Sequence, residues 1–341
     1  MQNYIEDHLY KRSLLSYLLC PVSIKYALFQ KCRRGFYRLF SSLVYKSKCK
    51  IISVGNIVCG GSGKTPFTIF LTRYLREKGF KVAVSHRGYK GKFEKQNKLI
   101  SDRNEIFDCA KVSGDEAYLL ASKLKGIPVI VGKNRKESIK ILEEKYPDLD
   151  YIILDDSFQH LKVFHDLDFV VFNEIGGIGN GFVLPAGILR ESISALKFAD
   201  YLVFNGEGKI PEKLLKFGKP VLKGNYKIKR FYDINENEIS LETLKRSEIA
   251  LLSAIGMPKS FEDTIQKSGL KFKKHFLFAD HYDFKDKRIL QNIEKELEKD
   301  KIDFLLTTEK DFAKLQFMKH NLPLVIVEVG FKLSNIEEMK M

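Results

Sequence analysis

This chain of 341 residues is best understood from Cys59-Gly60-Gly61-Ser62-Gly63-Lys64-Thr65, which follows the apolar run Ile51-Ile52-Ser53-Val54. A buried strand, a glycine-rich turn and then a helix, expected over residues 64–78, present free backbone N–H groups that bind polyphosphate. Lys64 is placed to reach the outer phosphates, and the Thr65 hydroxyl to bind the Mg²⁺ that bridges them. The stretch therefore predicts a nucleotide-binding phosphate loop that includes Gly60, Gly61, Ser62 and Gly63.

The loop departs from the usual phosphate-loop pattern at one position. Its first glycine should stand five residues before Gly63, and that position is Val58. The alternative to a phosphate site is a glycine-rich turn without a ligand. A Gly-Lys-Thr at a helix start after an apolar strand is the context that supports the motif, so we favour the phosphate site.

Composition and charge limit the class of protein. The length suits one large or two modest domains. The five cysteines show no C-x-x-C pairing and no clustering with histidine, which indicates reduced thiols in a cytosolic protein. The formal net charge is +15, and no acidic residue lies between Asp7 and Glu77.

The segment before the phosphate loop mixes many basic residues with leucine, isoleucine and aromatic residues. Such a helix lies in a membrane interface or packs on a partner. Its longest uncharged run, residues 13–24, contains Pro21 and is shorter than the ~20 residues of a spanning helix. An ordinary core helix with a solvated basic face is the alternative. We expect no nucleic-acid partner, because the chain has no recognition motif for one.

Strand and helix patterns alternate along the chain, which predicts an α/β fold: a mostly parallel sheet with helices on both faces, of the P-loop NTPase type. Strands are expected over 51–54, 81–85, 127–131, 151–154, 169–172 and 201–204, and helices over 116–125 and 135–146. A second α/β set is expected from strands over 249–253, 271–278, 304–307 and 324–329 and helices over 260–267 and 288–298. The expected organisation is a basic amphipathic helical segment (1–48), a nucleotide-binding domain (49–210), an extended linker (211–235) and a smaller C-terminal α/β domain (236–341). Residues 219–234 alternate apolar with basic and polar side chains, as an extended linker or a two-stranded ribbon would.

A second chemical signal is Tyr151-Ile152-Ile153-Leu154-Asp155-Asp156. An apolar strand that ends in acids places a carboxylate where it binds Mg²⁺ directly or through water. Adjacent side chains at a strand end point in different directions, so one Asp is expected at the metal and the other at the substrate or the loop. We therefore expect Asp155 and Asp156 to act with Lys64 and Thr65.

Several further motifs occur in a fixed order along the chain. They are Gly55-Asn56-Ile57, His86-Arg87-Gly88-Tyr89, Gly114-Asp115-Glu116, Asp155-Asp156-Ser157-Phe158-Gln159-His160, Leu184-Pro185-Ala186-Gly187-Ile188-Leu189-Arg190-Glu191, Phe278-Ala279-Asp280-His281 and Thr307-Thr308-Glu309-Lys310-Asp311. Together these motifs resemble those of the tetraacyldisaccharide 4'-kinase family of the lipid A pathway. The resemblance extends to about residue 315, and that family also lacks the first glycine of the loop. In this chain Tyr282 stands where the family commonly has a second histidine, and Ser157 where glycine is usual.

The resemblance implies transfer of the ATP γ-phosphate to the 4'-hydroxyl of tetraacyldisaccharide 1-phosphate, which gives lipid IVA. It implies that Asp115 is the catalytic base, paired with His281, and that Asp155 and Asp156 hold Mg²⁺ or order the site. It also implies that Asn56 belongs to the nucleotide site. The residues implied to line the substrate site are Arg87, Tyr89, Gln159, Arg190 and Glu191. From the residues alone, Asp115 could be a helix cap and His281 a loop histidine.

The implied substrate carries four acyl chains and stays in the bilayer, so the enzyme must reach it there. We expect the basic, apolar N-terminal segment to hold a monomer on the cytoplasmic face of the bacterial inner membrane, without a spanning helix. Two other classes compete with this interpretation. A soluble P-loop enzyme for a small metabolite would not need the segment, and a GTPase-type switch would carry an Asn-Lys-x-Asp motif, which is missing.

Overall fold

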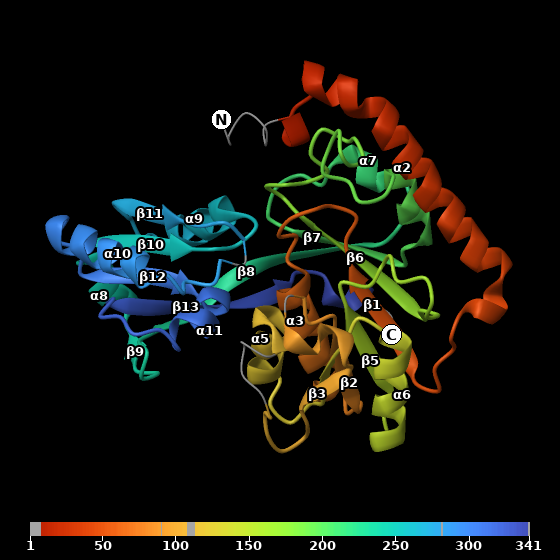
Figure 1. The fold of residues 1–341 in the computed structure, drawn as a ribbon, viewed down its shortest axis with the longest axis horizontal. Helices are drawn as coiled ribbons and strands as arrows, with labels where there is room; N and C mark the ends of the chain where they lie inside the picture. Colours follow the sequence, from red (N-terminus) through yellow and green to blue (C-terminus); the bar gives the residue numbers. More distant parts are fainter. Residues whose placement is uncertain (1–7, 90, 108–112, 281, 340–341) are drawn as a thin grey trace.

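The computed structural model describes residues 8–89, 91–107, 113–280 and 282–339. The described strands form one continuous sheet of thirteen strands in the order β11-β10-β12-β13-β8-β7-β6-β1-β5-β2-β4-β3, with β9 paired to β8 (Figure 1). The strands are β1 (Lys50–Gly55), β2 (Val82–His86), β3 (Lys98–Ser101), β4 (Val129–Val131), β5 (Tyr151–Asp155), β6 (Leu167–Asn173), β7 (Tyr201–Asn205), β8 (Val221–Tyr232), β9 (Glu238–Ile239), β10 (Ile249–Ser253), β11 (Lys274–Leu277), β12 (Phe304–Thr308) and β13 (Leu324–Leu333).

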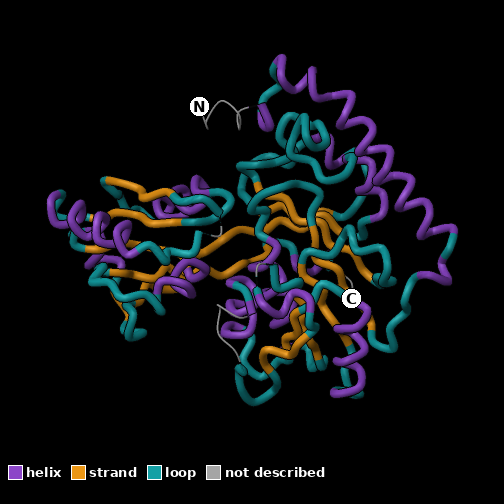
Figure 2. Tube along the Cα trace, in the orientation of Figure 1, coloured by secondary structure: helices purple, strands orange, loops and turns teal. Residues whose placement is uncertain are grey.

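Helices and short 3-10 turns connect these strands (Figure 2). The α-helices are α2 (Leu14–Leu39), α3 (Lys64–Glu77), α5 (Asp115–Lys123), α6 (Arg135–Lys145), α7 (Glu212–Leu215), α8 (Leu241–Lys245), α9 (Pro258–Lys267), α10 (Lys287–Lys299) and α11 (Glu309–Leu315). None of the helices in the described part of the chain is both long and apolar enough to cross a membrane.

The first lobe contains the phosphate loop and the strands from β8 to β3. Its pairs are parallel except for β3 with β4, the edge pair. Alternate side chains of β1 face opposite cores: Ile52 packs with α3 and α5, and Ile51 packs with α6. Helices therefore cover both faces of a mostly parallel sheet, which confirms the predicted fold class.

The second lobe repeats this plan at smaller scale. Its parallel strands β11, β10, β12 and β13 carry α10 on one face and α9 on the other. Leu290 of α10 packs with Leu252, whereas Ile265 of α9 packs with Leu251, the next residue of β10.

Two long antiparallel strands, β8 and β13, pass from one lobe to the other. Near its start β8 pairs with β7 of the first lobe, and its later residues pair with β13 and with β9. The segment 211–235, for which we expected an extended linker or a two-stranded ribbon, thus contributes one long strand to the shared sheet. Beyond the second lobe the chain returns, and Leu333 and Met339 pack in the first lobe's core beside Phe67.

Helix α2 lies along the outside of the first lobe, far from the second lobe (Figure 1). The four buried residues of α2 are polar: Ser16, Ser23, Gln30 and Arg34. Their spacing places them on one face of the helix. The opposite face exposes a stripe of large apolar side chains, among them Leu14, Leu18, Leu28, Phe29, Phe36 and Leu39. Helix α2 therefore has its polar side turned to the protein and its apolar side turned to solvent.

Candidate active site

The phosphate loop connects β1 to α3, and two of its glycines have backbone angles that other residues rarely adopt. The φ angles are +95° at Gly60 and +91° at Gly63, the residue that caps α3. A Cβ atom on Gly63 would also lie 2.3 Å from the hydroxyl oxygen of Tyr226 on β8. Glycine is therefore required at this position both by the backbone and by the space available.

Val58 occupies the place of the missing glycine, and its surroundings explain the exchange. Its side chain is buried in a core that also contains Phe158 and Ile188. Val58 forms an antiparallel bridge with Leu189, and the Cys59 amide donates a hydrogen bond of 2.8 Å to the Ile188 carbonyl. The start of the loop is thus paired with a neighbouring segment, and a valine side chain contributes apolar contacts there that glycine lacks.

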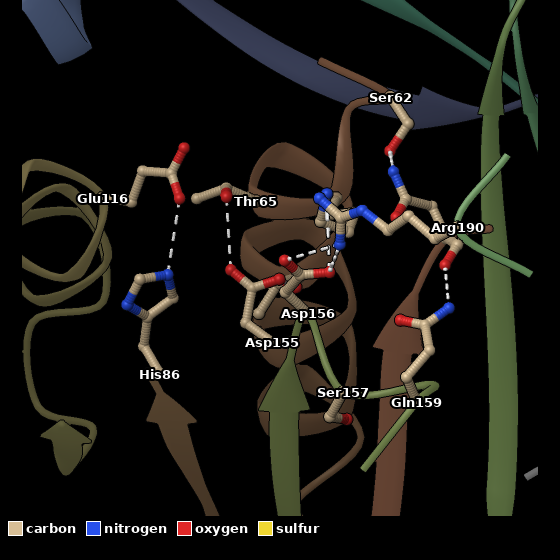
Figure 3. A network of polar contacts seen from close by, with 12 residues as sticks. Ser62, Thr65, His86, Glu116, Asp155, Asp156, Ser157, Gln159 and Arg190 are labelled. Atoms are coloured by element: carbon tan, nitrogen blue, oxygen red, sulfur yellow. Dashed lines mark hydrogen bonds and ion pairs between the residues drawn. The ribbon is translucent and has the colours of Figure 1, made fainter. Parts of the chain in front are cut away.

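Asp155 and Asp156 end β5 beside the phosphate loop and point in different directions (Figure 3). Asp156 has a φ of +51°, a left-handed conformation that aspartate tolerates. Its carboxylate lies 3.1 Å from Arg190 and 3.6 Å from the ammonium of Lys64. Burial raises the pKa of Asp156, but Lys64 and Arg190 outweigh that effect and lower the pKa below its usual value. Asp156 is therefore an anion held between two cations.

Asp155 is buried beneath the loop. Its two carboxylate oxygens accept hydrogen bonds of 3.2 Å from the hydroxyls of Thr65 and Thr68, both on α3. Arg135, also buried, donates from its guanidinium to the Asp155 carbonyl and to Ser85. Burial raises the pKa of Asp155. A buried carboxylate of this kind favours a cation nearby.

These oxygen atoms suit Mg²⁺ bound together with phosphates. Mg²⁺ prefers hard oxygen ligands and usually takes only one or two from protein, the rest from water and substrate phosphates. Thr65 and Asp155 offer a hydroxyl and a carboxylate at the start of the phosphate-loop helix. Within the described ranges, no group of three or more His, Cys, Asp or Glu side chains could hold a metal ion. The donors therefore fit a metal that arrives with a nucleotide.

A second polar cluster joins the two lobes across the site. Glu116 of α5 lies 3.4 Å from His86 at the end of β2 (Figure 3), and 3.0 Å from Lys310 of α11. Lys310 also lies 3.2 Å from Asp280. Burial raises the pKa of Glu116, but His86, Lys310 and Lys64 overcome it and hold the pKa well below its usual value. Glu116 is thus an anion that links the nucleotide lobe to the second lobe.

Asp115, the expected base, is the first residue of α5 and follows Gly114, whose φ is +91°. Its carboxylate lies 3.5 Å from the ammonium of Lys314 on α11. Lys314 is buried, and it also pairs with Asp311 and donates to the Tyr282 carbonyl. His281, the expected partner of Asp115, lies outside the described residues. Asp115 therefore sits at the junction of the lobes, with a lysine from the second lobe beside it.

The expected substrate residues fall into two groups. Arg87, Tyr89 and Arg190 line the cavity that contains the phosphate loop. Gln159 instead donates a hydrogen bond of 2.7 Å to the Asn56 carbonyl, outside the cavity lining. Glu191 is buried in an ion pair with Arg34 of α2. Gln159 and Glu191 thus lie outside the cavity lining and hold neighbouring segments in place.

Asn56 also has a supporting position. Its side-chain amide donates a hydrogen bond of 2.7 Å to the Ser62 hydroxyl. It is fully buried and is not among the residues that line the cavity. Asn56 therefore acts on the phosphate loop through Ser62.

The cavity lies between the lobes and has a volume of about 650 Å³. The phosphate loop, Glu116 and Asp156 line it from the first lobe, and Gly256, Asp280 and Lys310 line it from the second. A neighbouring hollow of about 830 Å³ shares Asn173, Tyr226, Ser260 and Thr264 with it. The two hollows give space for an elongated ligand whose charged end reaches the phosphate loop.

A phosphate loop at the end of a parallel strand, with Lys64, Thr65 and two strand-end aspartates beside it, defines a P-loop phosphotransferase. The comparison with known families identifies which family of P-loop phosphotransferases this chain belongs to. A family model described as tetraacyldisaccharide-1-P 4'-kinase matches residues 15–340, and the chain belongs to this family.

Curated relatives and a solved structure agree with this assignment. The tetraacyldisaccharide 4'-kinase of Pelobacter propionicus is 34% identical over 309 residues, which cover 89% of this chain and 84% of the relative. That of Desulfotalea psychrophila is 34% identical over 324 residues, 92% of each chain. The crystal structure of LpxK from Aquifex aeolicus in complex with ATP has a TM-score of 0.75 at 29% identity, covering 95% of this chain and 97% of the other.

Some residues of the site were not singled out from the sequence. Thr68 and Arg135 are part of ordinary helix patterns, so no local signal marks them. His86, Glu116 and Lys310 all stand in motifs that carried the family resemblance, and that was the available signal. Lys314, five residues after Glu309, could have been found only from the helical spacing of α11, which places it on the same side as Asp311.

Proposed function

We propose that this protein transfers the γ-phosphate of ATP to the 4'-hydroxyl of tetraacyldisaccharide 1-phosphate and forms lipid IVA, a step of lipid A biosynthesis. The observation that carries the proposal is the match of the tetraacyldisaccharide-1-P 4'-kinase family to residues 15–340 of a chain whose phosphate loop opens into an interlobe cavity. A related protein from Aquifex aeolicus has been solved in complex with ATP, which supports ATP as the phosphate donor.

ATP and Mg²⁺ would be held by residues around the phosphate loop. The backbone amides of residues 60–65 and the Lys64 ammonium bind the phosphates. Thr65 and Asp155 would hold Mg²⁺, which would supply positive charge beside the phosphates. Asn56 keeps Ser62 in place through its 2.7 Å hydrogen bond.

The reaction needs a proton acceptor and positive charge around the transferred phosphoryl group. Asp115 takes the proton of the 4'-hydroxyl, and the hydroxyl oxygen forms a bond to the γ-phosphorus. The bond from that phosphorus to the β–γ bridging oxygen breaks, and ADP leaves. The Lys314 ammonium lies 3.5 Å from the Asp115 carboxylate and orients it. Lys64 and Arg190 face the transferred group, and Asp156 orients both of them.

The substrate reaches this site from a membrane, and α2 offers the means of attachment. Its exposed stripe of leucine and phenylalanine suits the acyl boundary, and the exposed basic residues of the same helix suit an anionic surface. We therefore place the enzyme on the cytoplasmic face of the inner membrane as a peripheral protein. We further propose that it acts as a monomer and that nucleic acid has no part in its activity.

The proposed function is tested by an ATP-dependent kinase assay on tetraacyldisaccharide 1-phosphate in detergent micelles. Asp115→Asn should lower kcat by about 100-fold to 10,000-fold because the base is removed, and Lys64→Ala should abolish most transfer. Glu137→Gln is the matched control, because Glu137 is an exposed acid in the first turn of another helix, α6. Full activity of Asp115→Asn would remove the assigned base, and the absence of wild-type transfer would disprove the function.

A further inference from the structure

Arg34 is the single charged member of the polar stripe with which α2 faces the protein. Its side chain is almost fully enclosed, and the whole residue is 7% exposed. It therefore lies on the side of α2 opposite the apolar stripe. Arg34 is not available to a membrane surface, unlike exposed basic residues of the same helix such as Lys31.

The Arg34 guanidinium contacts two segments of the first lobe. It donates to both carboxylate oxygens of Glu191, at 3.3 and 2.8 Å, and to the Phe158 carbonyl at 3.2 Å. Its central carbon, Cζ, also lies over the rings of Phe158 and Phe198, at 4.6 and 5.1 Å from their centroids. Lysine cannot reproduce this combination of a planar fork and stacking.

Both segments lead directly into the active site. Glu191 follows Arg190, which pairs with Asp156 at 3.1 Å. Phe158 follows Asp156 by two residues in the same tight loop. Arg34 thus binds the loop that carries one aspartate of the site and the segment that carries that aspartate's arginine partner.

Arg33, the preceding residue of α2, makes a parallel connection. Its guanidinium donates a hydrogen bond of 2.7 Å to the Gln159 carbonyl. Gln159 in turn donates to the Asn56 carbonyl, and Asn56 donates to Ser62 of the phosphate loop, each at 2.7 Å. Arg33 therefore reaches the phosphate loop through two intermediate residues.

We propose that Arg34, assisted by Arg33, is a positioning residue for phosphoryl transfer, which fixes the Asp156 loop and the Arg190 segment relative to each other. Helix α2 then has two separate roles on its two faces: the apolar face meets the bilayer, and the polar face completes the frame of the active site. This inference rests on the proposed kinase function. It assigns to the helix an effect on turnover that does not depend on membrane attachment.

Arg34→Lys and Arg33→Ala test the inference in two assays, with Lys31→Ala as the matched control on the same helix. In the micelle kinase assay, Arg34→Lys should lower kcat by more than tenfold and Arg33→Ala by a few-fold, with the KM for ATP within threefold of wild type. Binding of Arg34→Lys to phosphatidylglycerol–phosphatidylethanolamine vesicles should not change, because Arg34 is buried and the substitution keeps its charge. Lys31→Ala should keep its kcat and lose roughly fivefold in vesicle binding. A merely structural role of Arg34 would lower thermal stability and leave the kcat of the folded enzyme unchanged.

Amide hydrogen exchange separates failure of this inference from failure of the proposed function. Arg34→Lys should speed exchange in residues 156–160 by at least tenfold and leave α6 unaffected. If wild type is active and both variants keep wild-type kcat, the inference is overturned and the function stands. If the wild-type enzyme transfers no phosphate, the proposed function is wrong, and amide exchange alone tests the positioning role. Faster exchange of residues 156–160 in Arg34→Lys than in wild type then supports that role, and unchanged exchange overturns it.

Discussion

Three leucines on the exposed face of α2 should carry much of the affinity of this protein for a bilayer. Leu14 is 78% exposed, Leu18 67% and Leu28 59%, so together they expose about two complete leucine side chains. Complete burial of a leucine side chain contributes about 2 kcal/mol, which gives about 4 kcal/mol for the three. A helix at the interface keeps part of each side chain hydrated, and half of that value, about 2 kcal/mol, is a lower bound.

The triple substitution L14Q/L18Q/L28Q removes this contribution and keeps helix propensity, because glutamine and leucine are similarly good helix formers. Since every 1.4 kcal/mol is a factor of ten, the partition coefficient should fall by about 30-fold to 1,000-fold. Sedimentation with vesicles of phosphatidylglycerol and phosphatidylethanolamine measures it directly. The kcat in detergent micelles should change little, because the polar face of α2 is intact.

Leu277→Gln is the matched control. Leu277 is 57% exposed, close to Leu28, but lies on β11 at the far edge of the second lobe (Figure 1). Its substitution should leave vesicle binding within a factor of two. If the triple variant binds vesicles as well as Leu277→Gln does, the apolar face of α2 is not the membrane-binding surface, and the reasoning from exposed area is refuted.

Two other predictions concern the site itself. Gly63→Ala should weaken binding of a fluorescent ATP analogue at least tenfold, and Tyr226→Phe in that background should restore part of the binding, because the added Cβ would lie 2.3 Å from the tyrosine hydroxyl. The control Gly79→Ala, with a φ of +88° but no atom within 4 Å of the added Cβ, should cost about 1 kcal/mol of stability and bind the analogue normally. Normal binding by Gly63→Ala would contradict the loop geometry. The pKa of Glu116 is depressed in the folded protein, so ionised Glu116 stabilises the fold at pH values above its unfolded pKa of about 4.3. This stabilisation is lost as the pH falls toward the folded pKa. The urea midpoint of Glu116→Gln should therefore lie below that of wild type at pH 6 and approach it as the pH falls from 5 to 3, whereas a constant gap would show that Lys310 and His86 do not act on an ionised Glu116.

Local sequence patterns predicted the chemistry at the phosphate loop and at the end of β5, because both depend on residues close together in the chain. The Gly63-Lys64-Thr65 turn and the Asp155-Asp156 strand end are such cases, and each expected strand of the first lobe is present. Strand β3 was not expected: Lys98–Ser101 is a short edge strand with a lysine at its start, and its antiparallel partner lies some thirty residues later.

Contacts between distant segments could not be predicted in this way. The alternating residues 219–234 indicated a linker or a two-stranded ribbon, but the pairing of β8 with β13 joins residues about 100 positions apart, so the sequence did not reveal the shared sheet. Arg34 is one of many basic residues in the N-terminal segment, and its burial against Glu191 depends on the fold of residues 158–191. The same holds for Glu191, which the family resemblance had suggested as a substrate residue.

The chain returns to the first lobe after β13, and this return limits where the gene can be truncated. Phe331, Leu333 and Met339 complete the core in which Phe67 of the phosphate-loop helix is packed. The second lobe is therefore an insertion within the first, and a stop codon near residue 210 would remove part of the nucleotide lobe's own interior. A minimal nucleotide-binding unit should instead be made by deleting the inserted residues and joining strand β8 to strand β13 through a short turn.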